Sequence, residues 1–194
     1  MGASGCRGPV EERKVMVQNN GIHATVSAWE KRGGVWREVF RTENGFVGQN
    51  GIISAEKKQE GDGATPAGEY VMRRAFGMVD NPETSLDYTR IEMDDVWVDD
   101  PHSEHYNQYI KASSGIKRDW STAEELMPLG NIYKYAIVVE YNTDPVIKGK
   151  GSAIFLNNSR GFPTAGDIGV PEKYIKRFFQ FVRPGDKIVI EKGD

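Results

Sequence analysis

The clearest alternation of apolar and polar positions lies near the start of the chain. "HATVSAW" (23–29) and "VWREVFR" (35–41) alternate apolar and polar residues, a pattern that is typical of half-buried strands. The four residues between them, Lys31-Arg32-Gly33-Gly34, include two glycines and suit a tight turn. This part of the sequence therefore predicts a β-hairpin.

Further strands are expected along the rest of the chain. Each is a short run of apolar or β-branched residues bounded by Gly, Pro, Asn or Asp. They are "GEYVMRRAF" (68–76), "IEMDDVWVD" (91–99), "YAIVVEYN" (135–142), "SAIFL" (152–156) and "DKIVIE" (186–191). "FVGQNGI" (46–52) is punctuated by glycine and is expected to be a loop.

Two segments carry helix signals. Ser121-Thr122-Ala123-Glu124 has the form of a capping box, which predicts a short helix through about Met127. "PEKYIKRFFQFV" (171–182) opens with proline, which is favourable at a helix start. Its apolar side chains fall on one face: Tyr174, Ile175, Phe178, Phe179 and Val182. We therefore expect a mainly β fold with a few helices (α+β), and core packing for the aromatic face of the second helix.

Composition and length indicate a folded globular chain, most simply one domain or one domain with a decorated edge. Of its 194 residues, 38% are hydrophobic and 27% are charged. We expect a flexible N-terminal tail over 1–13 and a single domain over 14–194. The net charge is −3, and basic residues form no run longer than a pair. The sequence therefore gives no sign of a basic surface that would bind nucleic acid. No apolar run approaches the length of a membrane span.

The single cysteine, Cys6, rules out an internal disulfide and a cysteine-rich metal site. Ala3-Ser4-Gly5-Cys6 is similar to the end of a bacterial lipoprotein signal, in which the cysteine is lipidated after cleavage. That interpretation needs a preceding apolar segment, which this chain does not contain. The alternative is an inert free thiol, so a lipid on Cys6 is the only membrane attachment that the sequence suggests.

Three ordered segments resemble the L,D-transpeptidase (YkuD-like) catalytic domain, and the resemblance extends over roughly residues 15–190. "GDGATPAGEY" (61–70) and "WVDDPHSEHYNQ" (97–108) each match a family motif. "KGSAIFL" (150–156), followed by "PTAG" (163–166), matches the active-site strand and loop of one branch. The resemblance implies a β-sandwich or barrel fold and an extracytoplasmic, cell-envelope protein. It also implies that the chain acts on peptidoglycan stem peptides without a cofactor.

The resemblance places the catalytic positions at 157 and 167, next to Gly166. Family members carry a histidine base directly after the strand and a cysteine nucleophile directly after Thr-Ala-Gly. Here these positions hold Asn157 and Asp167, and Ala165 stands where the commoner version has a second histidine. The chain's three histidines all lie outside the motif.

These replacements oppose the family reaction. Acyl transfer of this kind needs a thiolate and a partner that takes its proton. An asparagine amide is not basic, and a carboxylate at 167 would repel the oxyanion that the reaction builds. Losing a nucleophile alone costs about 10⁶ in turnover in a comparable catalytic unit. We therefore expect an inactive protein in which Asn157 and Asp167 face each other within direct or one-water hydrogen-bond reach.

A peptide-binding groove is expected beside this pair. The residues expected to line it are Trp97, Tyr106, Asn107, Asn158 and Thr164, because aromatic and amide groups suit an amide-rich ligand. For Trp97 and Tyr106, ordinary core packing is the competing interpretation. The expected partner is a peptidoglycan stem peptide or a protein of the cell envelope.

A loop with several potential metal ligands was weighed separately. Asp99, Asp100, His102, Glu104 and His105 lie close together in the sequence. The aspartates already match the family segment, and polar loops often have this composition, so no metal site is predicted.

Three explanations of the substituted site stay open beside a retained binding pocket. The first explanation is that the loop has decayed in the absence of catalytic constraint. The second is that an authentic transpeptidase has been altered at 157 and 167. The third explanation is a new chemistry in which Asp167 acts as acid, base or nucleophile. The genomic sequence at these two codons would separate a natural substitution from an engineered one.

Overall fold

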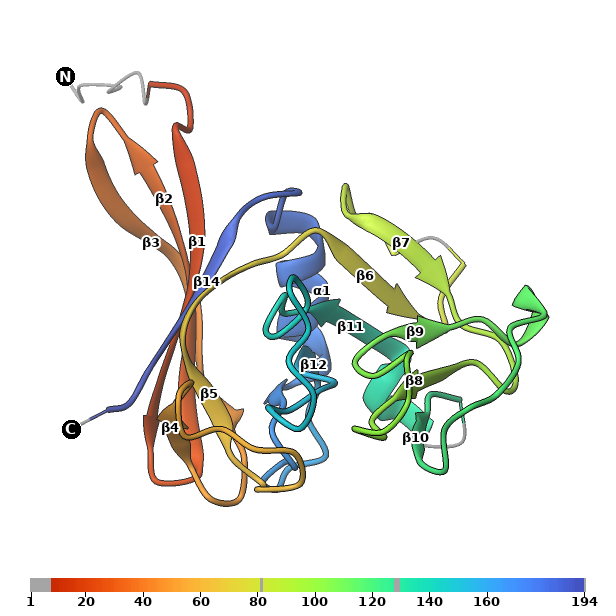
Figure 1. The fold of residues 1–194 in the computed structure, drawn as a ribbon. Coiled ribbons are helices and arrows are strands. Elements are labelled where there is room, and N and C mark those ends of the chain that lie inside the picture. Colours follow the sequence, from red (N-terminus) through yellow and green to blue (C-terminus); the bar gives the residue numbers. More distant parts are fainter. Residues whose placement is uncertain (1–7, 81, 128–129, 194) are drawn as a thin grey trace, which may run out of the picture.

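The computed structural model describes residues 8–80, 82–127 and 130–193, and most of its regular structure is β-sheet (Figure 1). The large sheet has eleven strands. In spatial order they are β4 (Ile52–Ser54), β5 (Thr65–Val71), β14 (Lys187–Glu191), β1 (Glu12–Asn20), β2 (His23–Arg32), β3 (Val35–Phe46), β13 (Ile168–Val170), β12 (Phe155–Asn158), β11 (Tyr135–Val138), β6 (Arg74–Gly77) and β7 (Asp87–Arg90).

The remaining elements are few. A small sheet contains β10 (Ala123–Glu125), β8 (Val96–Val98) and β9 (Tyr109–Ile110) in that order. The other regular elements of the described residues are helical. They are two 3-10 turns, η1 (Ala112–Ser114) and η2 (Gly130–Lys134), and one α-helix, α1 (Glu172–Phe181). The mainly β fold class is confirmed. Among the described residues, no helix is long and apolar enough to cross a membrane.

The predicted hairpin is confirmed and is longer than expected. β2 continues to Arg32 and β3 continues to Phe46, so the turn itself is Gly33-Gly34. Both glycines have positive φ, which is the backbone of the two-residue turn that best matches strand twist. β1, which was not predicted, pairs with β2 on one side and in parallel with β14 on the other. It begins at Glu12, inside the segment expected to be a tail, whereas Cys6 and the rest of 1–7 lie outside the described residues.

The predicted helix from Ser121 is wrong, because this segment forms strand β10. Its residues pair with β8, and Glu124 lies directly opposite Trp97. The hydroxyl of Ser121, expected to cap a helix, instead donates to Asp100 Oδ2 at 2.7 Å, as does the Ser121 amide. Asp100 thus takes both donors, and strand pairing overrides the local helix signal.

Other predicted strands exist with different bounds. The expected strand 68–76 is divided between β5 and β6, and the strand expected over 91–99 is reduced to β8. The strand expected over 135–142 ends at Val138 in β11. The strand expected over 152–156 begins three residues later and ends two residues later, as β12. The strand predicted over 186–191 is confirmed as β14.

Helix α1 packs its aromatic face into the main core, as predicted. Phe178 and Phe179 are fully buried. Phe178 lies 4.9 Å from Phe40 of β3, and Phe179 lies 5.3 Å from Tyr135 of β11, measured between ring centroids. The helix therefore fills the space between the long β1–β3 ribbon and the β6–β11 part of the sheet (Figure 1).

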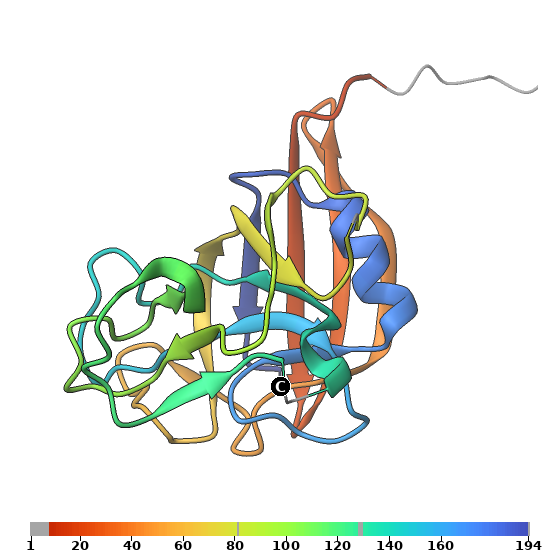
Figure 2. The same cartoon turned by 90° about the vertical axis from the view of Figure 1, so that its right-hand side faces the viewer.

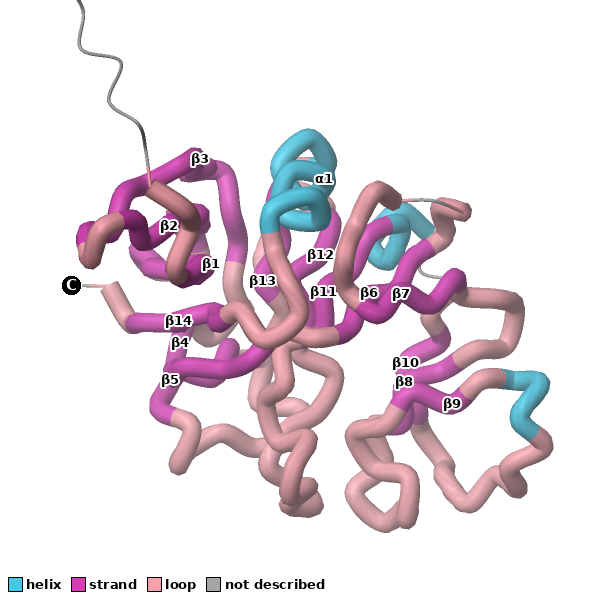
Figure 3. The backbone as a smooth tube through the Cα atoms, turned by 90° about the horizontal axis from the view of Figure 1, so that it is seen from above, coloured by secondary structure: helices cyan, strands magenta, loops and turns pink. Residues whose placement is uncertain are grey.

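Strands β11 and β12 separate two apolar clusters. Alternate residues of a strand point to opposite faces. Ile137 and Leu156 belong to the main core with α1, whereas Val138 and Phe155 belong to a second cluster with Trp97 of the small sheet. Figure 2 shows β11, in teal, and β12, in light blue, running across the direction of β1 and β2. Seen from above, α1 lies on one side of β12 and β13, and long loops extend on the other side (Figure 3).

Candidate active site

The centre of the site is the loop between β12 and β13. These strands are parallel neighbours, with Asn157 opposite Gly169 in the register. The loop leaves β12 after Asn158 and returns at Asp167, immediately before Ile168. Chain positions ten residues apart are thereby brought side by side.

Asn157 and Asp167 form a direct hydrogen bond. Asn157 Nδ2 donates to Asp167 Oδ2 at 2.6 Å, and the backbone amide of Phe155 donates to Asp167 Oδ1 at 2.8 Å. Each carboxylate oxygen therefore has a donor, and Asn157 is only 1% exposed. The predicted facing of these two side chains is confirmed.

The electrostatics of Asp167 are dominated by burial. Desolvation raises the pKa of this carboxyl well above its ordinary value, and the charge of Glu124 raises it further. The hydrogen bonds from Phe155 and Asn157 favour the charged form and oppose this shift. Burial likewise raises the pKa of Glu124, with Asp99 adding to the effect.

Thr164 and Gly166 shape the turn before Asp167. Thr164 Oγ1 donates to the Asp167 carbonyl at 2.7 Å and accepts the Gly166 amide at 3.1 Å. Gly166 is buried, and a side chain there would bring its Cβ within 3.1 Å of Ile154 Cδ1. The turn is therefore fixed by its own residues.

Thr65, from the Asp-Gly-Ala-Thr-Pro motif, fastens this turn to the rest of the sheet. Its hydroxyl donates to the Gly166 carbonyl at 2.8 Å and accepts the Gly48 amide at 2.9 Å. Thr65 is fully buried. A Cβ on Gly48 would lie 2.4 Å from the Gly63 carbonyl, so only glycine permits this approach.

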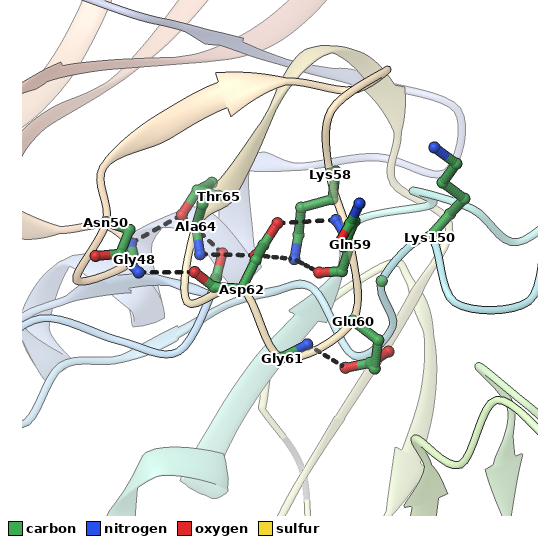
Figure 4. A network of polar contacts seen from close by, with 12 residues as sticks. Gly48, Asn50, Lys58, Gln59, Glu60, Gly61, Asp62, Ala64, Thr65 and Lys150 are labelled. Atoms are coloured by element: carbon green, nitrogen blue, oxygen red, sulfur yellow. Dashed lines mark hydrogen bonds and ion pairs between the residues drawn. The ribbon is translucent and has the colours of Figure 1, made fainter.

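Asp62 organises the loop that leads to Thr65 (Figure 4). It accepts from Lys58 Nζ at 2.6 Å and from the amides of Gln59 and Ala64. Partial burial by itself raises the pKa of Asp62, but the hydrogen bonds from Lys58 and the two amides hold it below its ordinary value. The positive charge of the buried Lys58 side chain is thus paired with Asp62 within this loop.

A pocket of about 400 Å³ opens beside the Asn157–Asp167 pair. Asn157, Asn158, Thr164, Gly166 and Asp167 all line it, so the structure brings five of the eight sequence-predicted site residues together. Its charged lining residues are Lys58, Glu60, Asp99, Glu124, Arg160 and Asp167, and its apolar ones include Ile132, Ile154 and Phe162.

The other three predicted site residues do not line this pocket. Trp97, Tyr106 and Asn107 are at most 4% exposed. Trp97 Nε1 donates to Asn107 Oδ1 at 2.9 Å, and the same oxygen accepts the Ala153 amide at 3.0 Å. Tyr106 donates to Glu60 Oε2 at 2.5 Å. These side chains support the pocket wall from behind, which agrees with the core-packing interpretation of Trp97 and Tyr106.

Sequence reasoning missed Glu60 and Glu124. Glu124 is the last residue of the supposed capping box, Ser121-Thr122-Ala123-Glu124. Its position opposite Trp97 could be found only through the pairing of β10 with β8. Glu60 lies two residues before the start of the Asp-Gly-Ala-Thr-Pro motif. It accepts hydrogen bonds from Tyr106 and Ser152, which lie far from it in sequence.

The 99–105 loop is held by its own polar contacts. Asp100 accepts from Ser121 and from the His102 amide, and these hydrogen bonds hold the pKa of Asp100 well below its usual range. Ser103 donates to Asp119. Within the described ranges, no three His, Cys, Asp or Glu side chains are grouped so that they could hold a metal ion.

Comparisons with known proteins agree on the fold. The profile of the YkuD family, described as the L,D-transpeptidase catalytic domain, matches residues 15–190. No curated protein sequence matches the chain. Among solved structures, the helical cell shape determining protein Pgp2 from Campylobacter jejuni superposes with a TM-score of 0.52 at 18% identity, over 97% of this chain and 51% of that one. A single-residue variant of Pgp2 gives 0.53 at 19% identity, over 97% and 50% of the two chains. The chain thus spans about half the length of these neighbours.

Proposed function

Because the chain belongs to the L,D-transpeptidase catalytic-domain (YkuD) family, we propose that it is a cell-wall protein that binds peptidoglycan stem peptides without cross-linking them. The cell envelope is then its place of action, outside the cytoplasm. Pgp2, which shares the fold, is described as a cell-shape determining protein, which is in keeping with a role in the wall. A protein of the envelope that presents a similar peptide is the alternative partner.

The observation that carries this proposal is the hydrogen bond between Asn157 and Asp167. It joins the two positions that hold the base and the nucleophile in the family, and it satisfies both carboxylate oxygens together with the Phe155 amide. An amide that donates to a carboxylate holds the loop, but the pair offers no thiolate, and the asparagine cannot take a proton in place of the histidine. The pocket beside the pair has room for part of a peptide.

Preservation of the surrounding frame supports binding over decay of the loop. Thr65, Gly48 and Gly166 hold the turn through buried hydrogen bonds and contacts too close for any other residue at 48. A loop released from every constraint has no need of such a frame.

A second candidate function follows from the position of Glu124. It lines the same pocket as Asp167, and the two carboxyls influence each other's charge state. Two carboxyls in different environments are the usual equipment of acid–base hydrolysis. This candidate predicts that muropeptides are cleaved by the protein, and that Glu124→Gln abolishes the cleavage.

The proposal is tested by titrating ¹⁵N-labelled protein with a purified stem tetrapeptide and with muropeptides. We expect the largest chemical-shift changes at Asn158, Thr164 and Ala165, and smaller ones at the buried Trp97 and Tyr106. The same samples, followed by mass spectrometry, report any cross-linked or cleaved product. A titration that moves no signal around the pocket would refute the binding function, and a product would refute the inactivity.

A further inference from the structure

Strand β3 has a long edge that no other strand in the described part of the chain covers. It pairs with β2 along one side, whereas on its other side β13 pairs with it only at Gly169 and Phe46. From Val35 to Gly45, the outward-pointing N–H and C=O groups therefore face no partner strand. The strands that end the two sheets, β4, β7, β9 and β10, are only two to four residues long. The β2–β3 ribbon also projects from the body of the molecule, so its edge is accessible (Figure 1).

The side chains along this edge do not protect it from another strand. Val35 and Val39 are 53% and 47% exposed, and among the described residues they are the only exposed large hydrophobic side chains that lie on a strand. Proteins commonly protect a long edge with lysine or proline, and β3 contains neither. Its charges alternate in sign along the strand and sum to zero: Arg37, Glu38, Arg41 and Glu43. The edge therefore carries no net charge that would repel a second edge of the same kind.

A bulge in β3 decides which of these charges share a face of the sheet. In the register with β2, Phe40 and Glu38 lie opposite consecutive residues, so Val39 is the extra residue. Phe40 points toward α1 and packs on it. Glu38 and Arg41, on the two sides of the bulge, both point to the opposite face, with 3.8 Å between their charged groups. Their side chains are 32% and 55% exposed, so a strand that pairs with this edge meets both charges.

We propose that the open edge of β3 pairs with the same edge of a second copy of this chain, antiparallel and around a two-fold axis at the bulge. Because the bulge puts Glu38 and Arg41 on one face, this register places Glu38 of each copy opposite Arg41 of the other. The interface then contains two intermolecular ion pairs and a ladder of backbone hydrogen bonds. Val39 of both copies lies at the axis, where its exposed side chain is removed from water. The two eleven-stranded sheets are thereby joined edge to edge.

Self-complementarity favours a second copy over an unrelated peptide. A two-fold interface brings the same surface together twice, so its charges must match when the strand is reversed. The pair Glu38 and Arg41 meets this condition on either side of the axis. Strand pairing along one edge is small for an interface, so we expect a weak dimer with a dissociation constant of about 10–100 µM. The inference goes beyond the proposed function and does not depend on it, because β3 contributes no residue to the pocket lining.

Sedimentation equilibrium of the full chain tests whether a dimer forms. All samples carry Cys6→Ser, so that a disulfide between copies cannot imitate the association. Between about 1 µM and about 1 mM protein, the average mass should rise from that of one chain to that of two. A mass that stays at one chain throughout, or that grows beyond two chains, would overturn the proposal.

Charge reversal locates the interface. Glu38→Arg alone, or Arg41→Glu alone, sets like charges opposite each other, and each should raise the dissociation constant by about tenfold or more. An equimolar mixture of the two single variants should associate again, because opposite charges then face each other in the mixed dimer. The loss of the ion pair within one chain cannot produce this recovery. A mixture that associates no better than its components would refute the two-fold register.

A charge elsewhere on the sheet gives the matched control. Glu69→Arg reverses an exposed charge on β5 and breaks its ion pair with Lys187, three strands away from β3 in the sheet. It should leave the dissociation constant unchanged. Weakening as large as that of the β3 variants would show that the interface is not specific to the β3 edge.

Hydrogen exchange measures the backbone ladder without any substitution in β3. As the protein concentration rises through the dissociation constant, amide exchange in peptides that cover 36–43 should slow. Exchange in β1 should not change, because β1 is already paired on both sides by β14 and β2. Association that leaves exchange in 36–43 unchanged would place the contact elsewhere and overturn the edge pairing. If a charge variant fails to fold, as judged by its thermal melt, this measurement decides.

Discussion

Asp167 is held in the folded protein by two donors and by burial, and these act on its charge in opposite directions. The amide of Asn157 and the backbone of Phe155 favour the carboxylate, whereas desolvation and Glu124 favour the neutral acid. The second pair of causes prevails, so the pKa is raised. A sequence can predict that residues 157 and 167 meet, because the family places reacting groups there, but it cannot predict this balance.

The raised pKa has a direct consequence for stability. Between the ordinary aspartate pKa and the raised one, the folded protein binds a proton that the unfolded chain has released, so Asp167 makes the fold less stable as pH rises through this window. Asp167→Asn removes this titration. We expect the free energy of unfolding of the variant, relative to the parent, to increase as pH rises above the ordinary aspartate pKa of about 4.

Urea denaturation at a series of pH values measures this difference. The variant also loses one hydrogen bond, but that cost does not depend on pH, so only the slope matters. Asp186→Asn serves as a positive control for the method, because burial also raises the pKa of Asp186, which lies at a different place in the fold. A relative stability of the Asp167 variant that is flat or falls with pH would contradict the assignment.

At the scale of elements, local signals succeeded where packing agreed with them. The alternation in 23–41 and the apolar face of 171–182 both correspond to buried faces, so hairpin and helix form as predicted. The 121–127 segment failed, because Asp100 captures Ser121 and β8 pairs with the residues that follow. β1 was missed because its register depends on β14, which lies at the other end of the chain.

The clamp made by Thr65 is the element-scale feature with the clearest test. Thr65→Val keeps the shape of the side chain but removes the hydroxyl that joins the Gly48 amide to the Gly166 carbonyl. Both groups would be left buried without a partner, so we expect a loss of about 2–3 kcal/mol in the free energy of unfolding. Denaturation in urea measures it, and ligand titration should show weaker binding.

Thr25→Val is the matched control for this clamp. It makes the same exchange of β-branched residues on a partly buried position of β2 and should change stability by about 0.5 kcal/mol or less. Equal losses in the two variants would show that Thr65 has no special role in holding the loop.

The whole molecule is two apolar clusters joined by β11 and β12, with the pocket where the second cluster meets the 157–167 loop. The sequence indicated the first cluster through its amphipathic elements. It did not indicate the second one, because Phe76, Trp97 and Phe155 come from segments far apart in the chain. For the same reason, Glu60 and Glu124 were not recognised as pocket residues.

Trp97 tests whether the second cluster is structural. It is 2% exposed and packs against Phe155 at 4.8 Å between ring centroids. Trp97→Ala should cost about 3–5 kcal/mol in the free energy of unfolding, as is usual for a large buried aromatic residue. Trp36→Ala, on the partly exposed face of β3, should cost about 1 kcal/mol or less. A Trp97 variant that keeps its stability and loses only ligand binding would instead support direct contact with the ligand.

The central claim is that Asn157 and Asp167 preserve the site without its chemistry. Intact-mass spectrometry after incubation with a carbapenem tests it most directly, because carbapenems acylate family members through their cysteine. Both samples should carry Cys6→Ser, so that the chain's own thiol cannot react. We predict no mass change for this otherwise unmodified chain, and one acyl adduct when Asn157→His and Asp167→Cys are introduced together. An adduct on the chain with Asn157 and Asp167 in place would contradict the account.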